Sequence, residues 1–179
     1  MPEIVILRMG HRPFRDNRVT SHVCLTARAF SASKVIISDV VDEKIRSTVE
    51  KIVERWGGPF SIEMGTPWRK AVSSWKEKGG AVVLLTMYGE NIADSDVLKR
   101  ITELRKDLLI IVGSEKINPE CYKVCDFQVA VGNEPHAETS ALAVFLHEFW
   151  KGRELAHKFK GAKLRVIAQK RGKKVIKVK

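Results

Sequence analysis

The chain has 179 residues, 44% of them hydrophobic, which is enough for one well-buried core and makes a single domain the default. No apolar run approaches the roughly 18 residues that a membrane span needs, and the first residues lack the pattern of a secretory leader, so we expect a cytoplasmic protein. The net charge is +11, and residues 153–179 carry +10 of it, because eleven Lys or Arg residues there stand against Glu154 alone. Such a segment is typical either of binding to a nucleic-acid backbone or of a solubilising tail.

Strand-like apolar runs alternate with amphipathic segments along the chain. Strands are predicted at residues 3–9, 34–39, 60–64, 81–87, 108–112 and 126–131. Helices are predicted at residues 20–30, 41–56, 67–78, 94–105, 119–124 and 138–151. The first two strands are apolar runs of the kind found in strands that are buried on both faces. The alternation therefore predicts an α/β fold in which helices cover both faces of a parallel sheet.

The loop between the first strand and the first helix is rich in arginine. Residues 10–18 contain a single acidic residue and three arginines, Arg12, Arg15 and Arg18. Thr20 or Ser21 is the expected N-cap of the helix that follows. The loop should therefore present positive charge at the carboxyl end of the first strand.

Three consecutive late strands each end in a short loop of mostly small residues: TMYG at residues 86–89, VGSEK at 112–116 and VGNEPH at 131–136. The nucleotide-binding patterns G-x-G-x-x-G and G-x-x-x-x-G-K-[ST] do not occur in the sequence. Each loop taken alone is typical of an ordinary connection between a strand and a helix. If the three strands are neighbours, however, the loops converge into a cleft rich in backbone donors and acceptors, which suits a neutral heterocycle or a zwitterion.

The cysteines and the basic tail each allow two interpretations. Cys121 and Cys125 form one C-x3-C pair without a second pair, so buried or half-buried thiols on a short helix are favoured over a zinc site, and no metal is expected. In residues 164–178 apolar and basic residues alternate around Arg171 and Gly172, which predicts a β-hairpin with a basic face. We accordingly divide the chain into a domain of residues 1–152 and a basic extension of residues 153–179.

Four segments carry a resemblance to a known family: GHRPFRDNRVTSHVCLTARAF, LTMYG, IIVGSEK and VAVGNEPHAETSALAVFL. In this order they resemble the sequence blocks of the archaeal tRNA (cytidine(56)-2'-O)-methyltransferase family, which is part of the SPOUT superfamily of knotted methyltransferases. The resemblance implies a parallel α/β sheet with a C-terminal trefoil knot, a homodimer, and S-adenosyl-L-methionine as the cofactor, held in the knot loops. It also implies tRNA as the partner, with methylation of a ribose 2'-oxygen, at cytidine 56 in the TΨC loop, as the reaction.

The resemblance also implies roles for individual residues. The implied cofactor site consists of Leu85, Thr86, Met87, Tyr88, Gly89, Val112, Gly113, Ser114, Glu115, Lys116, Ala130, Val131, Gly132, Asn133, Glu134, Pro135, His136, Ser140 and Ala141. The implied catalytic residues are Arg28, Glu115 and Asn133, with the three loop arginines as alternatives to Arg28. Since a guanidinium is effectively always charged, the arginine would position the ribose while Glu115 or an RNA phosphate accepts the proton. RNA phosphates would be bound by the loop arginines and by four residues of the tail, Lys170, Arg171, Lys173 and Lys174.

Two alternative functions remain, together with an expectation about assembly. A knotted methyltransferase that acts on rRNA or on a base nitrogen would explain the three loops equally well. A non-catalytic RNA-binding protein would explain the basic tail and the arginines but not the three loops. The helix at residues 138–151 has a broad apolar face, which predicts that it packs against a partner helix in a dimer. The residues of this face are Leu142, Phe145, Leu146, Phe149 and Trp150.

Overall fold

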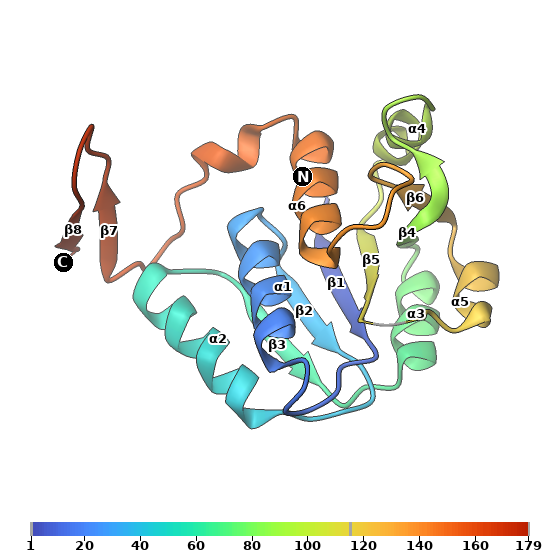
Figure 1. Ribbon diagram of the computed structural model, residues 1–179, viewed down its shortest axis with the longest axis horizontal. Coiled ribbons are helices and arrows are strands. Elements are labelled where there is room, and N and C mark those ends of the chain that lie inside the picture. Colours follow the sequence, from blue (N-terminus) through green and yellow to red (C-terminus); the bar gives the residue numbers. More distant parts are fainter. Residues whose placement is uncertain (1, 115, 179) are drawn as a thin grey trace.

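The structure is a computed structural model that describes residues 2–114 and 116–178 (Figure 1). Its centre is a six-stranded sheet in the order β3-β2-β1-β5-β4-β6. The strands are β1 (Ile4–Met9), β2 (Lys34–Ile37), β3 (Ser61–Met64), β4 (Ala81–Asn91), β5 (Leu108–Gly113) and β6 (Phe127–Ala130). All neighbouring pairs in this sheet are parallel, so the predicted parallel sheet is confirmed.

Helices cover both faces of the sheet because alternate residues of a strand point to opposite sides. Ile4 and Ile6 of β1 share a core with α1 (Asn17–Ala29), α2 (Glu43–Trp56), α4 (Val97–Glu103) and α6 (Glu138–Trp150). Val5 and Leu7 share a second core with α3 (Trp68–Glu77) and α5 (Pro119–Val124). The prediction of helices on both faces is therefore confirmed, and each helix lies within a few residues of its predicted range.

The start of α1 differs from the prediction. The helix begins at Asn17 and not near Thr20, so Arg18 lies on the helix instead of in the loop. Asp16 occupies the N-cap position but makes no capping bond with its side chain. Its carboxylate instead accepts from the Arg12 guanidinium, with 2.8 Å between Nε and Oδ2. The Asp16 carboxylate therefore forms an ion pair with Arg12 instead of a capping bond. Thr20 and Ser21, the predicted N-cap residues, lie inside the helix.

β4 is longer than predicted, and its second half contains an irregularity. The strand runs to Asn91 instead of ending at Met87, and Leu85 and Glu90 both pair with Val129 of β6. Residues 86–89 between these two pairs bulge out of the strand, which is how a β-strand accommodates extra residues. The first of the three predicted loops, TMYG, is therefore a bulge inside β4 and not a strand end.

Beyond α6 the chain crosses the body and ends in a separate pair of strands. After the short 3-10 helix η1 (Arg153–Ala156), the Phe159 ring lies 4.1 Å from the Arg28 guanidinium carbon, and Lys160 forms a β-bridge with Gly58. β7 (Leu164–Ile167) and β8 (Lys174–Lys177) then pair antiparallel with each other. Figure 1 shows this hairpin beside the carboxyl end of α2, at the opposite end of the molecule from α5 and the β4–β6 edge.

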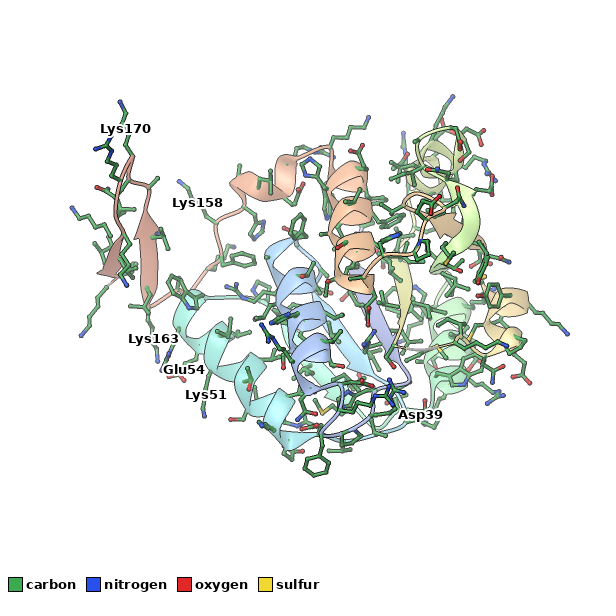
Figure 2. The ribbon with its side chains drawn as sticks, in the orientation of Figure 1. Asp39, Lys51, Glu54, Lys158, Lys163 and Lys170 are labelled. Carbon is green, nitrogen blue, oxygen red and sulfur yellow. The ribbon has the colours of Figure 1, made fainter. Side chains whose placement is uncertain are left out.

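One ion pair holds the base of the hairpin to α2. The Lys163 ammonium lies 2.6 Å from Glu54 Oε1, and Figure 2 shows the two residues together at the carboxyl end of α2. Lys170 lies at the far end of the hairpin and points away from the body. The residues of β7 and β8 are mostly exposed. The tail is thus anchored at its base and solvated along its length.

α6 buries its own apolar face within the single chain. Its five large apolar residues are at most 6% exposed, packed against α1 and the sheet: Leu142, Phe145, Leu146, Phe149 and Trp150. The prediction that this face packs against a partner helix is therefore wrong, because the core already covers it. Within the part of the chain that the structure describes, no helix is long and apolar enough to cross a membrane.

Candidate functional site

The three predicted loops converge at one edge of the sheet. β5, β4 and β6 are neighbours in the strand order, as the prediction required. Because the strands are parallel, their carboxyl ends lie together, and the loops that follow β5 and β6 meet the bulge of β4. We call residues 86–89 the first loop, residues 112–116 the second loop and residues 131–137 the third loop.

Asn133 ties the third loop to the first loop. Its side-chain nitrogen donates to the carbonyl oxygen of Met87 at 2.8 Å and to that of Gly89 at 3.2 Å. Gly132 precedes it with a φ of 80°, a conformation that favours glycine, and this turn brings the amide to the bulge. Asn133 therefore lies among the loops as predicted, and its amide holds two of them together.

Gly89 occupies a place in the first loop that no larger residue fits. A Cβ atom there would lie 2.5 Å from the backbone carbon of Gln128 and 2.5 Å from the backbone nitrogen of Val129. β4 and β6 approach this closely only because Gly89 has no side chain. The close approach holds the first loop against β6, beside the start of the third loop.

Arg8 links the second loop to the end of the third loop, and the sequence analysis missed it. It is the last residue but one of β1 and is 1% exposed. Its guanidinium donates to the Gly113 carbonyl oxygen at 2.5 Å and to Glu138 Oε1 at 2.9 Å. The prediction treated residues 3–9 as one apolar run. The overlooked signal was a charged side chain inside a strand that is buried on both faces, since a buried charge needs partners.

A cavity of about 490 Å³ opens between the first and second loops. It is lined by Thr86, Tyr88, Lys116, Ile117, Pro119 and Tyr122. The hydroxyl oxygens of Thr86 and Tyr122 lie 3.4 Å apart. The size is that of a small-molecule site, and apolar and aromatic walls with a few polar groups suit a nucleoside. The last three lining residues were not predicted, because they follow the second loop in the sequence.

The other predicted cofactor residues fall into several groups. Three are buried in the sheet and pack into the core: Leu85, Val112 and Ala130. Three are exposed in the third loop: Glu134, Pro135 and His136. In this loop His136 Nδ1 lies 2.6 Å from the Glu134 carbonyl oxygen. Two lie in the first turn of α6: Ser140 and Ala141. Glu115, predicted both as a catalytic and as a cofactor residue, lies outside the described residues.

Arg28 lies away from the three loops of its own chain. α1 returns the chain from the carboxyl end of β1 to the amino end of β2, and Arg28 is in its last turn. Its guanidinium donates to the carbonyl oxygens of Trp56 at 2.7 Å and Gly57 at 2.8 Å, and Phe159 covers it. Burial lowers the pKa of this guanidinium. Arg28 thus fastens the tail to α2 at the opposite edge of the sheet. Its role in catalysis stays a prediction.

The arginine loop, residues 10–18, lies beside the second loop, where the Ser114 hydroxyl donates to the Gly10 carbonyl oxygen. The hydrogen bond from Arg12 holds the pKa of the Asp16 carboxyl below its usual value. Arg15 and Arg18 are exposed, and neither is paired with a residue that the structure describes. Phe14 is 96% exposed and has a φ of 69°, which is strained for a large side chain. The loop therefore presents one aromatic ring and two guanidinium groups to solvent.

The cysteines pack into the protein as the sequence analysis expected. Cys24 and Cys121 are buried and Cys125 is half-buried. Burial raises the pKa of Cys24 to about 12 and that of Cys121 to about 11, and it also raises the pKa of Cys125. Cys121 Sγ lies 3.7 Å from Met9 Sδ in the interior. In residues 2–114 and 116–178, no three His, Cys, Asp or Glu side chains are grouped so as to hold a metal ion.

Comparison with known protein sequences gives a consistent result. A family model described as tRNA ribose 2'-O-methyltransferase, aTrm56, matches residues 56–176. The chain is 51% identical over 176 residues to the tRNA (cytidine(56)-2'-O)-methyltransferase of Staphylothermus marinus, which covers 98% of this chain and 94% of that protein. It is 52% identical over 176 residues to the protein of the same name from Thermococcus kodakarensis, and this match covers 97% of this chain and 96% of that protein.

Solved structures of low sequence identity share the fold. A TrmH/SpoU tRNA modifying enzyme from A. aeolicus matches with a TM-score of 0.60 at 16% identity, over 86% of this chain and 77% of that one. The SpoU methyltransferase AviRb from Streptomyces viridochromogenes, in complex with AdoMet, also matches with a TM-score of 0.60 at 16% identity. The match covers 84% of this chain and 58% of the longer AviRb chain. At such identities the likeness concerns the fold alone.

Proposed function

The chain belongs to the tRNA ribose 2'-O-methyltransferase family, and from this premise we propose that it transfers a methyl group from S-adenosyl-L-methionine to the ribose 2'-oxygen of cytidine 56 in tRNA. The cavity between the first and second loops, with the third loop tied to the first by Asn133 and an exposed arginine loop beside the second, carries the proposal. A cavity can hold the methyl donor, and exposed guanidinium groups can neutralise RNA phosphates. The two features lie where the donor and the acceptor of one reaction would meet.

The residues around the cavity fit a donor that contains a nucleoside. The walls include two tyrosines, an isoleucine and a proline, which offer flat and apolar surfaces to adenine. The backbone of the three loops offers donors and acceptors to its polar edge. When bound, S-adenosyl-L-methionine supplies a methyl group on a positively charged sulfur. We keep the cofactor residues named from the sequence as part of this proposal and add Ile117, Pro119 and Tyr122.

The tasks left to the side chains are to hold the RNA, to orient the 2'-hydroxyl and to accept its proton. We assign phosphate contacts to Arg15 and Arg18, and stacking on a base to the exposed ring of Phe14. Glu115 is the proposed proton acceptor, on the chemistry of its carboxylate, with an RNA phosphate as the alternative. Asn133 moves from catalysis to holding the loops, because its amide already donates to two carbonyl groups.

The tail supplies a second proposed surface for RNA. Four basic residues lie at or near the turn between β7 and β8 and are exposed: Lys170, Arg171, Lys173 and Lys174. Lys170, at the far end of the hairpin, points away from the body (Figure 2). The phosphate backbone of an RNA helix could approach these residues without hindrance from the sheet domain. Arg12, which is paired with Asp16, would shape the arginine loop and contact phosphate from its base.

We further propose a trefoil knot in the segment from β4 to α6, a homodimer, and a cytoplasmic location. The family resemblance and the close approach of Gly89 to the β6 backbone support the knot. Val19 of α1 and Val144 of α6 are 40% and 41% exposed, which leaves apolar surface on two packed helices for a second copy of the chain. Sedimentation over a range of micromolar concentrations measures the assembly, and a monomer throughout the range would contradict the dimer.

Methylation of a tRNA transcript that lacks modifications tests the reaction. With methyl-labelled donor we expect label on the ribose of cytidine 56, located by nuclease digestion and mass spectrometry. The matched control is a tRNA with 2'-deoxycytidine at that position, which keeps the base but lacks the acceptor oxygen, and it should remain unlabelled. Label on a base, or label that survives the deoxy substitution, would contradict the ribose assignment. A protein that binds tRNA but shows no heat of binding with the donor would be a non-catalytic RNA-binding protein.

A further inference from the structure

We propose that Arg8 is a positioning residue for the methyl donor, which holds the second and third loops in the arrangement that binds the donor. The inference rests on the proposed function. Arg8 lies on the central strand β1, touches neither substrate in the proposed reaction, and acts through the loops. Arg8 is also the largest of the side chains that are fully buried in the described residues.

The position of Arg8 in the sheet explains its reach. β1 lies between β2 and β5, and Arg8 is opposite Ile37 on one side and Val112 on the other. Its side chain points to the same face as Ile4 and Ile6, where α1 and α6 pack. It therefore leaves the centre of the sheet directly beneath the second loop and the first turn of α6. A guanidinium in such a place is stable only when its donors are paired.

The peptide unit between Gly113 and Ser114, in the second loop, is held from both sides. The Gly113 carbonyl accepts from Arg8 Nη1 at 2.5 Å, and the Ser114 N–H donates to the Met9 carbonyl at 3.0 Å. These two groups belong to one planar peptide unit, so the two bonds fix its orientation. The Ser114 hydroxyl adds a third bond, to the Gly10 carbonyl. Without Arg8 the Gly113 carbonyl loses the partner that sets the direction of the loop.

The same guanidinium holds the end of the third loop. Arg8 Nη2 lies 2.9 Å from Oε1 of Glu138, which opens α6 directly after residues 131–137. A carboxylate in the first turn of a helix is also stabilised by the helix dipole. Because Asn133 joins the third loop to the first, Arg8 and Asn133 together connect all three loops. Removal of either side chain should loosen the donor site as a whole.

A chain of hydrogen bonds extends from Arg8 to the base of the arginine loop. Arg8 Nε lies 3.5 Å from Thr20 Oγ1, which lies 2.9 Å from His11 Nδ1, and His11 Nε2 lies 3.2 Å from Asp42 Oδ2. With a single proton on His11, at Nε2, the N–H and O–H groups are all matched: Arg8 Nε–H donates to Thr20, the Thr20 hydroxyl to His11 Nδ1, and His11 Nε2–H to Asp42. The network is buried, with His11 4% exposed and Thr20 fully covered. The second and third loops and the arginine loop are therefore held by one buried hydrogen-bond network.

Substitution of Arg8 and Glu138 tests the inference by donor binding and by exchange of backbone amides. In R8M and E138A we expect calorimetry to show donor affinity reduced by about tenfold or more, because misplaced binding groups lose much of their effect. In the absence of donor, amides at residues 112–114 and 131–138 should exchange with deuterium faster than in the natural protein. R28M is the matched control: it removes another buried arginine that donates to backbone carbonyls, and donor affinity should be unchanged.

The outcomes separate a positioning role from a merely structural one. The double variant R8M/E138A should bind the donor no more weakly than R8M alone, because both changes break the same pair. If R8M folds and keeps the affinity and the exchange pattern of the natural protein, the proposal is overturned. If R8M does not fold, E138A decides the matter, because its side chain is 27% exposed and leaves the core intact. A natural protein that binds no donor would instead overturn the proposed function.

Discussion

Asn133 donates to two carbonyl oxygens, and this chemistry sets the effect of replacing it. N133A removes both hydrogen bonds between the third and first loops, and we expect donor affinity to fall by about thirtyfold, since each bond is worth about 1 kcal/mol. N133D has nearly the same shape, but a carboxylate accepts and cannot donate. Calorimetry should therefore find N133D at least as impaired as N133A. An N133D protein with natural affinity would show that the amide does not hold the loops.

The thiols should react slowly, because burial raises the pKa of each of them. Alkylation requires the thiolate, and a raised pKa leaves less thiolate at pH 8 than a free cysteine has. We expect iodoacetamide to label Cys125 first, because Cys24 and Cys121 are both buried and have pKa values of about 12 and 11. Mass spectrometry of the native protein over time measures the order. Early labelling of Cys24 would show that α1 opens readily.

At the residue level, the sequence located the loops but did not show which arginine side chain reaches them. Gly132, Asn133 and Pro135 are residue types that favour turns, so the third loop could be recognised from the local pattern. The partners of an arginine depend on which edge of the sheet its side chain reaches. Arg28 reaches the amino edge and Arg8 the carboxyl edge, and only the folded helix and strand decide this. The positions of glycine and asparagine in turns could thus be predicted from the sequence, whereas the partners of a long charged side chain could not.

The close packing of β4 on β6 depends on the lack of a side chain at residue 89. In G89A the new methyl group would meet the β6 backbone at 2.5 Å, and backbone cannot move aside as a flexible side chain can. We expect a loss of about 2 kcal/mol or more in the free energy of unfolding, measured by urea denaturation. G132A is the control from the third loop, where nothing lies within 4 Å and only the positive φ is unfavourable, at about 1 kcal/mol. Equal losses in the two variants would contradict the close approach.

At the level of elements, the strands and helices were predictable because both obey strong local patterns. β1 is buried at every position, so its apolar run gives a clear strand signal despite Arg8. Two details were not predictable, since each depends on a competition between alternative partners. Asp16 pairs with Arg12 instead of capping α1, which moves the start of the helix. The bulge of β4 forms against a strand that lies some forty residues later in the sequence.

For the whole molecule, the structure shows where the tail should be cut. Residues 153–163 contact the body at several points, with Glu154 only 4% exposed and Lys160 bridged to Gly58, whereas the strands after Lys163 are mostly exposed. A protein ending at Lys163 lacks seven basic residues of the full chain and no acidic ones. We expect weaker tRNA binding and a shallower dependence of affinity on salt, by about one unit of slope for each RNA phosphate that the hairpin neutralises. Donor affinity should be unchanged.

A matched control for the truncation keeps the hairpin and removes its charge. Lys170, Lys173 and Lys174 are all exposed near the turn, and their replacement by glutamine should leave the fold intact. The triple variant should reproduce most of the change in salt dependence, measured by filter binding between about 50 and 200 mM salt. A truncation that weakens binding with an unchanged slope would mean that the hairpin acts through its shape and not through its charge.

The placement of the hairpin has a consequence for the time course of the reaction. The charge concentrated there lies at the far end of the molecule from the cavity (Figure 1), so it can attract RNA without altering the field around the methyl donor. Added salt should then slow the encounter, which long-range attraction accelerates, while the rate of a single turnover from preformed complex stays nearly constant. The capture of RNA and the methyl transfer could thus be changed separately, by substitutions at opposite ends of the same small molecule.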